Sequence, residues 1–319
     1  MPSSNVQWGM SLTRLNPWYP GQFGVPGTDH TTGLRLDTNA IILYVDRNHV
    51  DANDNRDGTD PTSPLATVQA AVNKCRQYMN DTIVVMHNSY WYDTSAAYAR
   101  KLPVQEDVII NTPGIRIVGL APSSTLGVPW LPGTTGGTCI TVNAFDVVIE
   151  GFNFMDTAGN NATGIHAVWD GTAVWGDAMT VRHCYFNTNL DYGIQVNFSY
   201  YTDIHHNYFQ GINVAAIHEV AGGNESDYIA IHDNWFSYCV AAINLPSVDG
   251  AHIYNNTIHG DPTGTNNYIN LTSGADNAVH HNVLNCSLGA QFNLTCSDAT
   301  SGSWIQNYLL NGPNVAPPT

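Results

Sequence analysis

The chain has 319 residues, 43% of them hydrophobic and 11% charged, which is enough apolar material for one or two domains with a buried core. No apolar run approaches the roughly 18 residues of a membrane span, and the first residues show no basic segment followed by an apolar stretch. Ten Lys and Arg against 26 Asp and Glu give a net charge of −16, which disfavours nucleic acid and anionic membranes. We therefore expect no nucleic-acid partner, no membrane partner and no secretion signal.

Residues 1–40 contain many aromatic residues, prolines and glycines, without a sustained helical or strand period. Such a segment does not fold on its own and is typical of an arm that lies against another surface. We predict that residues 1–40 form an extended N-terminal anchoring arm. Its predicted binding residues are Trp8, Arg14, Trp18, Tyr19 and Phe23.

Residues 41–106 are predicted to hold an entry strand, a turn-rich loop and a short capping helix. Ser63 is the expected N-cap of this helix and Pro64 its first residue, because these residue types favour those positions. Apolar residues then recur at helical spacing and predict the buried face of the helix. They are Leu65, Val68, Ala71 and Val72.

The loop at residues 53–58 is similar in part to a calcium-binding loop, with candidate ligands at Asn53, Asn55 and Asp57. A calcium loop of that kind begins with Asp and has Glu at the twelfth position, and this loop has neither. We therefore favour an ordinary turn, and we predict no metal and no cofactor.

From residue 107 to 312 the sequence is repetitive. The pattern apolar-x-x-Asn-x-apolar recurs every 22 to 27 residues, with looser copies before and after the clearest ones. Repeats of this length indicate a stack of similar structural units. The clear copies begin at Ile204, Ile231, Ile253 and Val279, and the looser ones at Ile149, Val181 and Trp304.

A second series with the same period lies between these copies and predicts another strand in each unit. Each unit then holds three short strands with period-2 alternation and no helical segment, which predicts one coil of a parallel β-helix. The repeated Asn falls at a tight bend, where Asn tolerates unusual backbone angles and its amide can bond its copies in neighbouring coils as a ladder. The second series begins at Ile165, Ile194, Ile217, Ile243, Ile269 and Phe292.

The coil pattern resembles the right-handed parallel β-helix proteins of the pectin-lyase-like superfamily over residues 107–310. The entry strand, loop and helix also resemble that superfamily, in which this segment plugs the N-terminal end of the coil. The resemblance implies an all-β, right-handed, single-stranded parallel β-helix of about eight coils, three short strands per coil. It does not imply one function, because one fold hosts many.

Many β-helix proteins act on polysaccharides, so the resemblance first suggests a lyase or a hydrolase. The lyases use an Arg or Lys base and cations that hold uronate groups, and residues 117–319 contain 15 acidic residues but only one cation, Arg182. Charge therefore disfavours a lyase. A glycoside hydrolase needs two carboxyl groups about 5 to 9.5 Å apart, one of them with a raised pKa.

Glu219 is the best single candidate for such a carboxyl, because its column position is apolar in neighbouring coils. Asp203, Asp227 and Asp233 are possible second members. The alternative, which we favour, is that the strand ends at His218 and that Glu219 faces water in the following loop.

The 13 histidines are patterned as well. Strand alternation places His205, His232, Tyr254 and His280 in one outward column, preceded by Arg182. Such a column can share a metal, sense pH or line a subunit contact, but a stacked polar face is the simplest interpretation. A second outward column is predicted on another face, and it can bind a glycan or a protein neighbour. It comprises His166, Gln195, His218, Asn244, Asn270 and Asn293.

Residues 313–319 form a Pro-rich tail, and no capping helix follows the last predicted coil. An uncapped coil exposes unpaired backbone groups that a neighbouring chain can cover. The chain thus resembles β-helix proteins of bacteriophage particles. We predict a structural virion protein, a homotrimeric capsid decoration or fibre-like component anchored by residues 1–40 to a protein surface such as a capsid. A polysaccharide-degrading enzyme or a glycan-binding module is the alternative.

Overall fold

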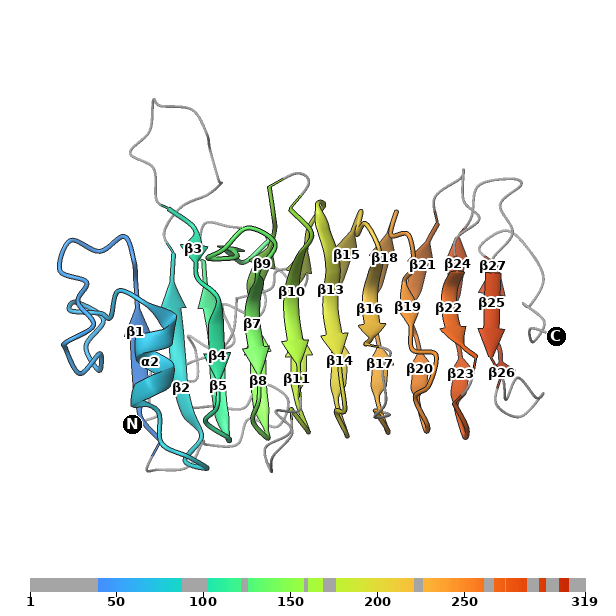
Figure 1. Cartoon of the computed structure of the whole chain (residues 1–319), viewed down its shortest axis with the longest axis horizontal. Coiled ribbons are helices and arrows are strands. Elements are labelled where there is room, and N and C mark those ends of the chain that lie inside the picture. Colours follow the sequence, from blue (N-terminus) through green and yellow to red (C-terminus); the bar gives the residue numbers. More distant parts are fainter. Residues whose placement is uncertain are drawn as a thin grey trace, which may run out of the picture.

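The computed structural model describes residues 40–87, 102–121, 126–157, 160–168, 176–220, 226–260, 267–272, 274–285, 293–296 and 304–309. Within these ranges the strands pair in parallel, each with the corresponding strand of the preceding and following coil. Three long sheets run side by side along the molecule (Figure 1). We call them sheet 1, sheet 2 and sheet 3 in the order in which each coil crosses them.

Sheet 1 carries the predicted histidine column. Its described strands are β1 (Ile42–Val45), β2 (Asp81–Met86), β5 (Ile115–Leu120), β8 (Val147–Glu150), β11 (Thr180–Arg182), β14 (Asp203–His205), β17 (Ala230–His232), β20 (His252–Tyr254), β23 (Ala278–His280) and β26 (Trp304–Ile305).

Sheet 2 follows sheet 1 after the bend that holds the repeated Asn. Its described strands are β3 (Val104–Gln105), β6 (Val128–Leu131), β9 (Phe152–Phe154), β12 (Tyr185–Phe186), β15 (Tyr208–Gln210), β18 (Trp235–Ser237), β21 (Thr257–His259), β24 (Val283–Asn285) and β27 (Tyr308–Leu309).

Sheet 3 completes each coil. Its described strands are β4 (Val108–Ile110), β7 (Thr138–Val142), β10 (Ala162–Ala167), β13 (Leu190–Val196), β16 (Ala215–Glu219), β19 (Ile243–Asn244), β22 (Asn267–Leu271) and β25 (Asn293–Cys296).

The core lies inside the coil and is built from like residues stacked on like residues. In sheet 2, for example, Phe186 stacks on Phe209 with ring centroids 4.6 Å apart, and Phe209 stacks on Phe236 at 4.9 Å. A single coil cannot bury its apolar side chains, so each coil depends on its neighbours for a continuous core. These pairings confirm the right-handed parallel β-helix predicted from the repeats.

The predicted asparagine ladder is present. Asn207, Asn234, Asn256, Asn282 and Asn307 are buried, and Nδ2 of each of the first four donates to Oδ1 of the Asn in the next coil at 2.9 to 3.1 Å. Each Nδ2 also donates to a carbonyl oxygen of the preceding coil, as Asn256 does to Ile231 at 2.9 Å. The ladder therefore satisfies backbone groups that the bend would leave buried and unpaired.

One detail of the bend differs from the prediction. The residue with the unusual backbone is the one before each Asn, as His206 (φ 55°), Asp233 (φ 53°) and His281 (φ 55°) show. The left-handed residue turns the chain and points outward, which leaves the Asn free to face the core.

The capping helix α2 (Val68–Lys74) begins later than predicted. Thr67 is its N-cap and accepts a hydrogen bond from the Ala70 N–H at 3.2 Å. Ser63 and Pro64 lie before the helix, because Leu65 instead donates its N–H to the Tyr44 carbonyl of β1 at 2.8 Å. The predicted apolar residues Leu65, Val68, Ala71 and Val72 are all buried, and α2 packs against β1, β2 and β4.

Candidate functional site

The predicted histidine column of sheet 1 is confirmed by the strand register. His205 pairs with His232, His232 with Tyr254, and Tyr254 with His280. Their rings are nearly parallel, with centroids 4.9, 4.7 and 5.3 Å apart. The parallel strands hold the rings one coil apart, which is close to the thickness that stacking requires.

Stacking uses the faces of these rings and leaves their edges toward solvent. The interplanar angles of 3°, 8° and 11° show that the inner rings of the column are covered on both sides. A ring edge offers nitrogen or hydroxyl groups for hydrogen bonds. An apolar ligand surface would instead stack on an exposed aromatic face. The column is therefore a row of polar edges.

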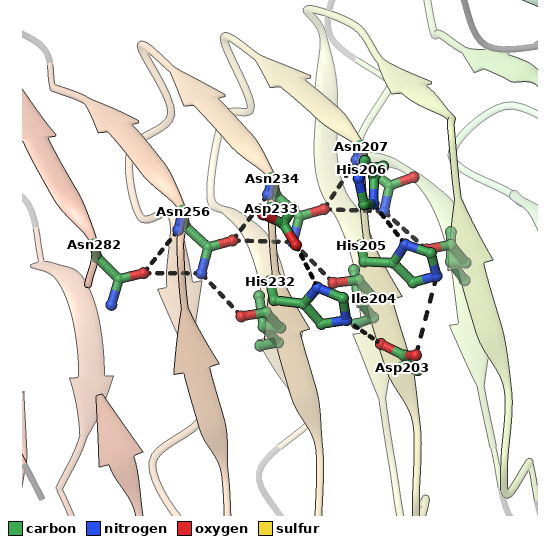
Figure 2. A network of polar contacts seen from close by, with 12 residues as sticks. Asp203, Ile204, His205, His206, Asn207, His232, Asp233, Asn234, Asn256 and Asn282 are labelled. Atoms are coloured by element: carbon green, nitrogen blue, oxygen red, sulfur yellow. Dashed lines mark hydrogen bonds and ion pairs between the residues drawn. The ribbon is translucent and has the colours of Figure 1, made fainter. Parts of the chain in front are cut away.

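The imidazole of His232 lies between two carboxylates, those of Asp203 and Asp233 (Figure 2). Its Nδ1 is 2.8 Å from Asp233 Oδ2, and its Nε2 is 3.1 Å from Asp203 Oδ1. Asp203 Oδ2 is also 4.0 Å from His205 Nε2. Asp203 precedes His205 by two residues in β14, and Asp233 follows His232 at the bend, so the coil register alone brings both carboxylates to one imidazole.

The carboxylates change the protonation of this cluster. Burial alone would lower the pKa of His232, but the contacts with Asp203 and Asp233 outweigh burial and raise it above its usual value. Burial would raise the pKa of Asp203, and the neighbouring imidazoles and Arg182 instead lower it. Both shifts favour the protonated form of His232 beside the ionised form of Asp203.

The other histidines of the column behave in the opposite way. Burial lowers the pKa of His205 to about 4, and His206 and His232 add to this effect while Asp203 opposes it. Burial also lowers the pKa of His280, helped by His252 and His281. Nδ1 of His205 lies 2.8 Å from Nδ1 of His206, and the same atoms of His280 and His281 are 2.7 Å apart. One nitrogen in each pair must be unprotonated to accept the hydrogen bond.

Sequence reasoning missed His206 and His281 at the bend, and it proposed Asp233 there only as a carboxyl partner of Glu219, although the signal was present. Each directly follows a member of the histidine column and precedes a ladder Asn. No three His, Cys, Asp or Glu side chains within the described ranges are arranged to hold a metal ion.

A buried ion triad extends the column toward the N-terminal coils. Glu150 is fully buried, and its Oε2 accepts from Arg182 Nε at 2.8 Å while its Oε1 accepts from Arg116 Nε at 2.9 Å. A lone buried carboxylate is costly, and two guanidinium groups compensate for it. Arg182, the only cation of the later coils, is therefore used inside the protein.

Glu219 does not face water as we had favoured. Strand β16 includes it, and only 2% of the residue is exposed. Its Oε2 accepts from the Ser247 N–H at 2.7 Å, and its Oε1 from the Ser226 N–H at 3.4 Å. The prediction failed because backbone N–H groups from the turn after β16 and from the following coil, which no sequence pattern reveals, replace water around the carboxylate.

The three other candidate carboxylates are divided between two places. Asp203 and Asp233 meet at His232, whereas Asp227 lies in the turn between sheet 3 and sheet 1, bridged to Tyr200 and Asp249. Burial raises the pKa of Asp227, while a backbone hydrogen bond with Asp249 opposes this effect and the charge of Asp249 adds to it. We call this the acidic turn, because it repeats an Asp in most coils. Its members are Asp146, Asp177, Asp227, Asp249 and Asp276.

The calcium candidates form local turns. Asn53 Oδ1 accepts from the Asn55 N–H at 2.9 Å, and Asp57 Oδ1 accepts from the Thr59 N–H at 3.1 Å. Asp54 instead binds the start of α2, accepting from the Ala66 and Thr67 N–H groups. The predicted arm residues Trp8, Arg14, Trp18, Tyr19 and Phe23 lie outside the described residues.

The second predicted column runs along sheet 3, with one error. His166, Gln195, His218, Asn244 and Asn270 are in register. In the last coil Asn270 pairs with Thr295 and not with Asn293, because an irregularity between Asn267 and Ile269 shifts the register. The sequence placed the next member of the column 23 residues after Asn270, whereas in the structure it lies 25 residues after Asn270.

A further outward row, on sheet 2, was not predicted. Tyr185 stacks on Tyr208 at 5.0 Å and Tyr208 on Trp235 at 6.2 Å. Trp235 is 43% exposed, and it is the largest exposed side chain in the row. We call this set the sheet 2 row; its members in register are Tyr185, Tyr208, Trp235, Thr257, Val283 and Tyr308.

Comparisons with known proteins add little beyond the fold. No family model matches the chain, and no curated protein matches it. Among solved structures, a single-residue variant of pectate lyase from Bacillus subtilis is similar, with a TM-score of 0.46 and 14% identity over 88% of this chain and 83% of that chain. Within the described residues no helix is long and apolar enough to cross a membrane.

Proposed function

We propose that this protein is a non-catalytic structural component of a larger particle, a β-helical shaft held to a protein surface by residues 1–40. The particle we propose is a virion, and the role is that of a homotrimeric capsid decoration or fibre-like component. The observation that carries the proposal is that the ladder asparagines, the rings of the histidine column and the Glu219 carboxylate contact protein groups of neighbouring coils.

The candidate catalytic carboxyl supports this assignment. A general acid must present its carboxyl group to a substrate, and Glu219 directs both oxygens at backbone N–H groups inside the protein. Asp203 and Asp233 are likewise engaged with one imidazole. These contacts stabilise the coils and orient no carboxyl toward a sugar.

The stacked columns support a shaft as well. The ladder of five Asn residues, the histidine column and the stacked Phe residues each link successive coils by the same contact. Repetition of one contact along an axis produces a stiff rod, because every coil constrains the next. A particle component that projects from a surface needs that property.

The alternative is a glycan-degrading or glycan-binding protein, and one observation favours it. His232 and its two carboxylates form an ionised cluster on an outer face, where a sugar hydroxyl can reach it. Replacement of Asp203 by Asn would then reduce glycan turnover or binding, whereas the structural role predicts no change in either.

Deletion of residues 1–40 tests the structural role. We expect the truncated chain to keep its β-rich circular dichroism spectrum and to lose its attachment to purified particles. Mass analysis of particles with bound full-length chain reports the number of copies. Unchanged attachment of the truncated chain would refute the anchoring role.

A second experiment tests the absence of catalysis directly. Glu219→Gln and Asp203→Asn are each incubated with a panel of neutral and acidic polysaccharides beside the wild-type chain. We expect no reducing ends from any of the three. Turnover by the wild type that either variant abolishes would contradict the proposal and favour a glycoside hydrolase.

A further inference from the structure

The sheet 2 row differs from the rest of the coil surface in its charge. Strands β9, β12, β15, β18, β21, β24 and β27 contain no Asp, Glu, Lys or Arg. The turns that follow β15 and β18, at residues 211–214 and 238–242, contain none either. An uncharged strip thus runs along the described coils of a chain whose residues 117–319 carry a net charge of −14.

The same strip exposes large apolar and aromatic side chains. Trp235 and Tyr308 project from the strands, and Val214, Tyr238 and Val240 project from the two turns. We call these strands and turns together the sheet 2 face. Protein interfaces are depleted in charged residues at their centre and enriched in Tyr and Trp, which matches this composition.

The acidic turn lies away from this face. It joins sheet 3 to sheet 1, and it is the one connection of each coil that does not border sheet 2. Asp227 and Asp249 are bridged there in neighbouring coils, so acidic groups already lie close together within one chain. A second copy that approached along this turn would bring its own acidic groups against them.

We propose that the sheet 2 face is the surface through which copies of this chain pack side by side around the axis of an oligomer. The inference rests on the proposed structural role and names the face that the oligomer uses. The occupant is a second copy of the chain, because the face carries no charge to attract an oppositely charged partner, and because two strongly acidic coils can meet there through the exposed Trp235, Tyr238 and Tyr308 side chains without opposing their charges.

This assignment replaces the histidine column as the subunit contact. Sheet 1 carries Asp203, Asp233 and the imidazole of His232 that contacts both, and burial of these groups against another chain would cost their remaining hydration. A sugar fits the sheet 2 face poorly, because Tyr208 has Tyr185 on one side of its ring and Trp235 on the other. Three copies joined by sheet 2 would place every acidic turn on the outside.

The substitution Trp235→Glu tests the inference in the full-length chain. It places one carboxylate per subunit at the centre of the proposed contact, where an unpaired charge opposes association. We expect the mass from light scattering to fall from the oligomer to one chain at micromolar concentration, with association weakened by about 100-fold or more. Circular dichroism reports whether the coil is still folded.

Tyr201→Glu is the matched control. Tyr201 is an aromatic residue in the acidic turn, 65% exposed and stacked on Tyr228 at 5.3 Å. We expect this variant to keep the wild-type mass. An oligomer that survives Trp235→Glu, or that Tyr201→Glu dissociates, would overturn the inference, as would a wild-type chain that stays monomeric at high concentration.

A cross-linking pair decides the case if Trp235→Glu does not fold. Val214→Cys places a thiol on the sheet 2 face, and Tyr201→Cys places one at the acidic turn. A short bis-maleimide should join two chains through the first variant and not through the second, and the reverse result would refute the inference. The particle-attachment experiment is independent, so a failure here leaves the proposed structural role open to its own test.

Discussion

Sheet 1 and sheet 2 are built on the same coil, and they differ in what they present to solvent. Sheet 1 presents histidines and Asp203 and holds the buried Arg116–Glu150–Arg182 triad, whereas sheet 2 presents tyrosines, Trp235, Thr257 and Val283 without a charge. Both rows stack in register, so backbone geometry does not distinguish them. The comparison shows that different faces of one β-helix can present different chemistry.

The two faces also differ in how they contribute to stability. Sheet 1 stabilises the coils through charges that are satisfied within the chain, and these contacts depend on pH. The rings of sheet 2 contribute dispersion and hydrophobic contacts, which depend little on pH. Substitutions on each face therefore separate the two contributions.

The largest effect is expected from Glu150→Ala on sheet 1. The change leaves Arg116 and Arg182 without their shared buried carboxylate, and we expect the free energy of unfolding to fall by about 3 to 5 kcal/mol. Denaturant unfolding followed by circular dichroism measures it. Asp203→Ala, whose side chain is 41% exposed, is the control and should cost less than about 1 kcal/mol. Equal losses of unfolding free energy in the two variants would show that the buried triad contributes no more than an exposed contact.

A slightly smaller loss is expected from Asn256→Ala, at the bend that joins the two faces. It removes hydrogen bonds to Asn234 and Asn282 and leaves buried backbone groups unpaired, for about 2 to 4 kcal/mol. Asn270→Ala, in the half-buried column of sheet 3, should cost about 1 kcal/mol. If the two variants unfolded at the same denaturant concentration, the ladder would have no structural advantage over a surface column.

Acidification should weaken the coils next, through His205 on sheet 1 and His166 on sheet 3. In the unfolded chain histidines take up protons near pH 6.5, but folded His166 and His205 do so only near pH 4. The unfolded state therefore binds more protons as pH falls from 7 to 5, and stability declines by an amount on the order of 2 kcal/mol. The raised pKa of His232 acts in the opposite sense, since its contribution is complete below pH 6.5 and is lost as pH rises through the folded value.

Thermal unfolding of the wild type and His205→Gln at pH 7 and pH 5 measures this dependence. We expect the melting temperature of the wild type to fall and that of the variant to fall less. A wild type that gains stability on acidification would mean that His232 dominates the column.

The smallest effect is expected from Tyr208→Ala on sheet 2. Loss of two ring stacks should reduce the free energy of unfolding by about 1 kcal/mol in a single chain. If copies pack through this face, the loss should grow with protein concentration, because the oligomer contributes to stability by mass action. Tyr201→Ala is the control, and its effect should not depend on concentration.

The sequence predicted the features that its aligned repeats mark, and it missed the sheet 2 row, the histidines at the bend and several features that occur once. The ladder Asn residues and the histidine column were predicted because each coil carries a copy, and copies fix the register. The start of α2, the burial of Glu219 and the register of Asn293 were wrong. In each case one local contact decided the outcome: the Leu65 hydrogen bond to β1, the Ser247 N–H, and an irregular pairing beside Ile269.

A structure of the assembled protein by electron cryomicroscopy, on its native particle, tests the central claim most directly. We predict three shafts with sheet 2 toward a common axis, the acidic turns outermost and residues 1–40 against the particle surface. A lone shaft with a glycan along sheet 1, or shafts that meet through the histidine column, would contradict the account.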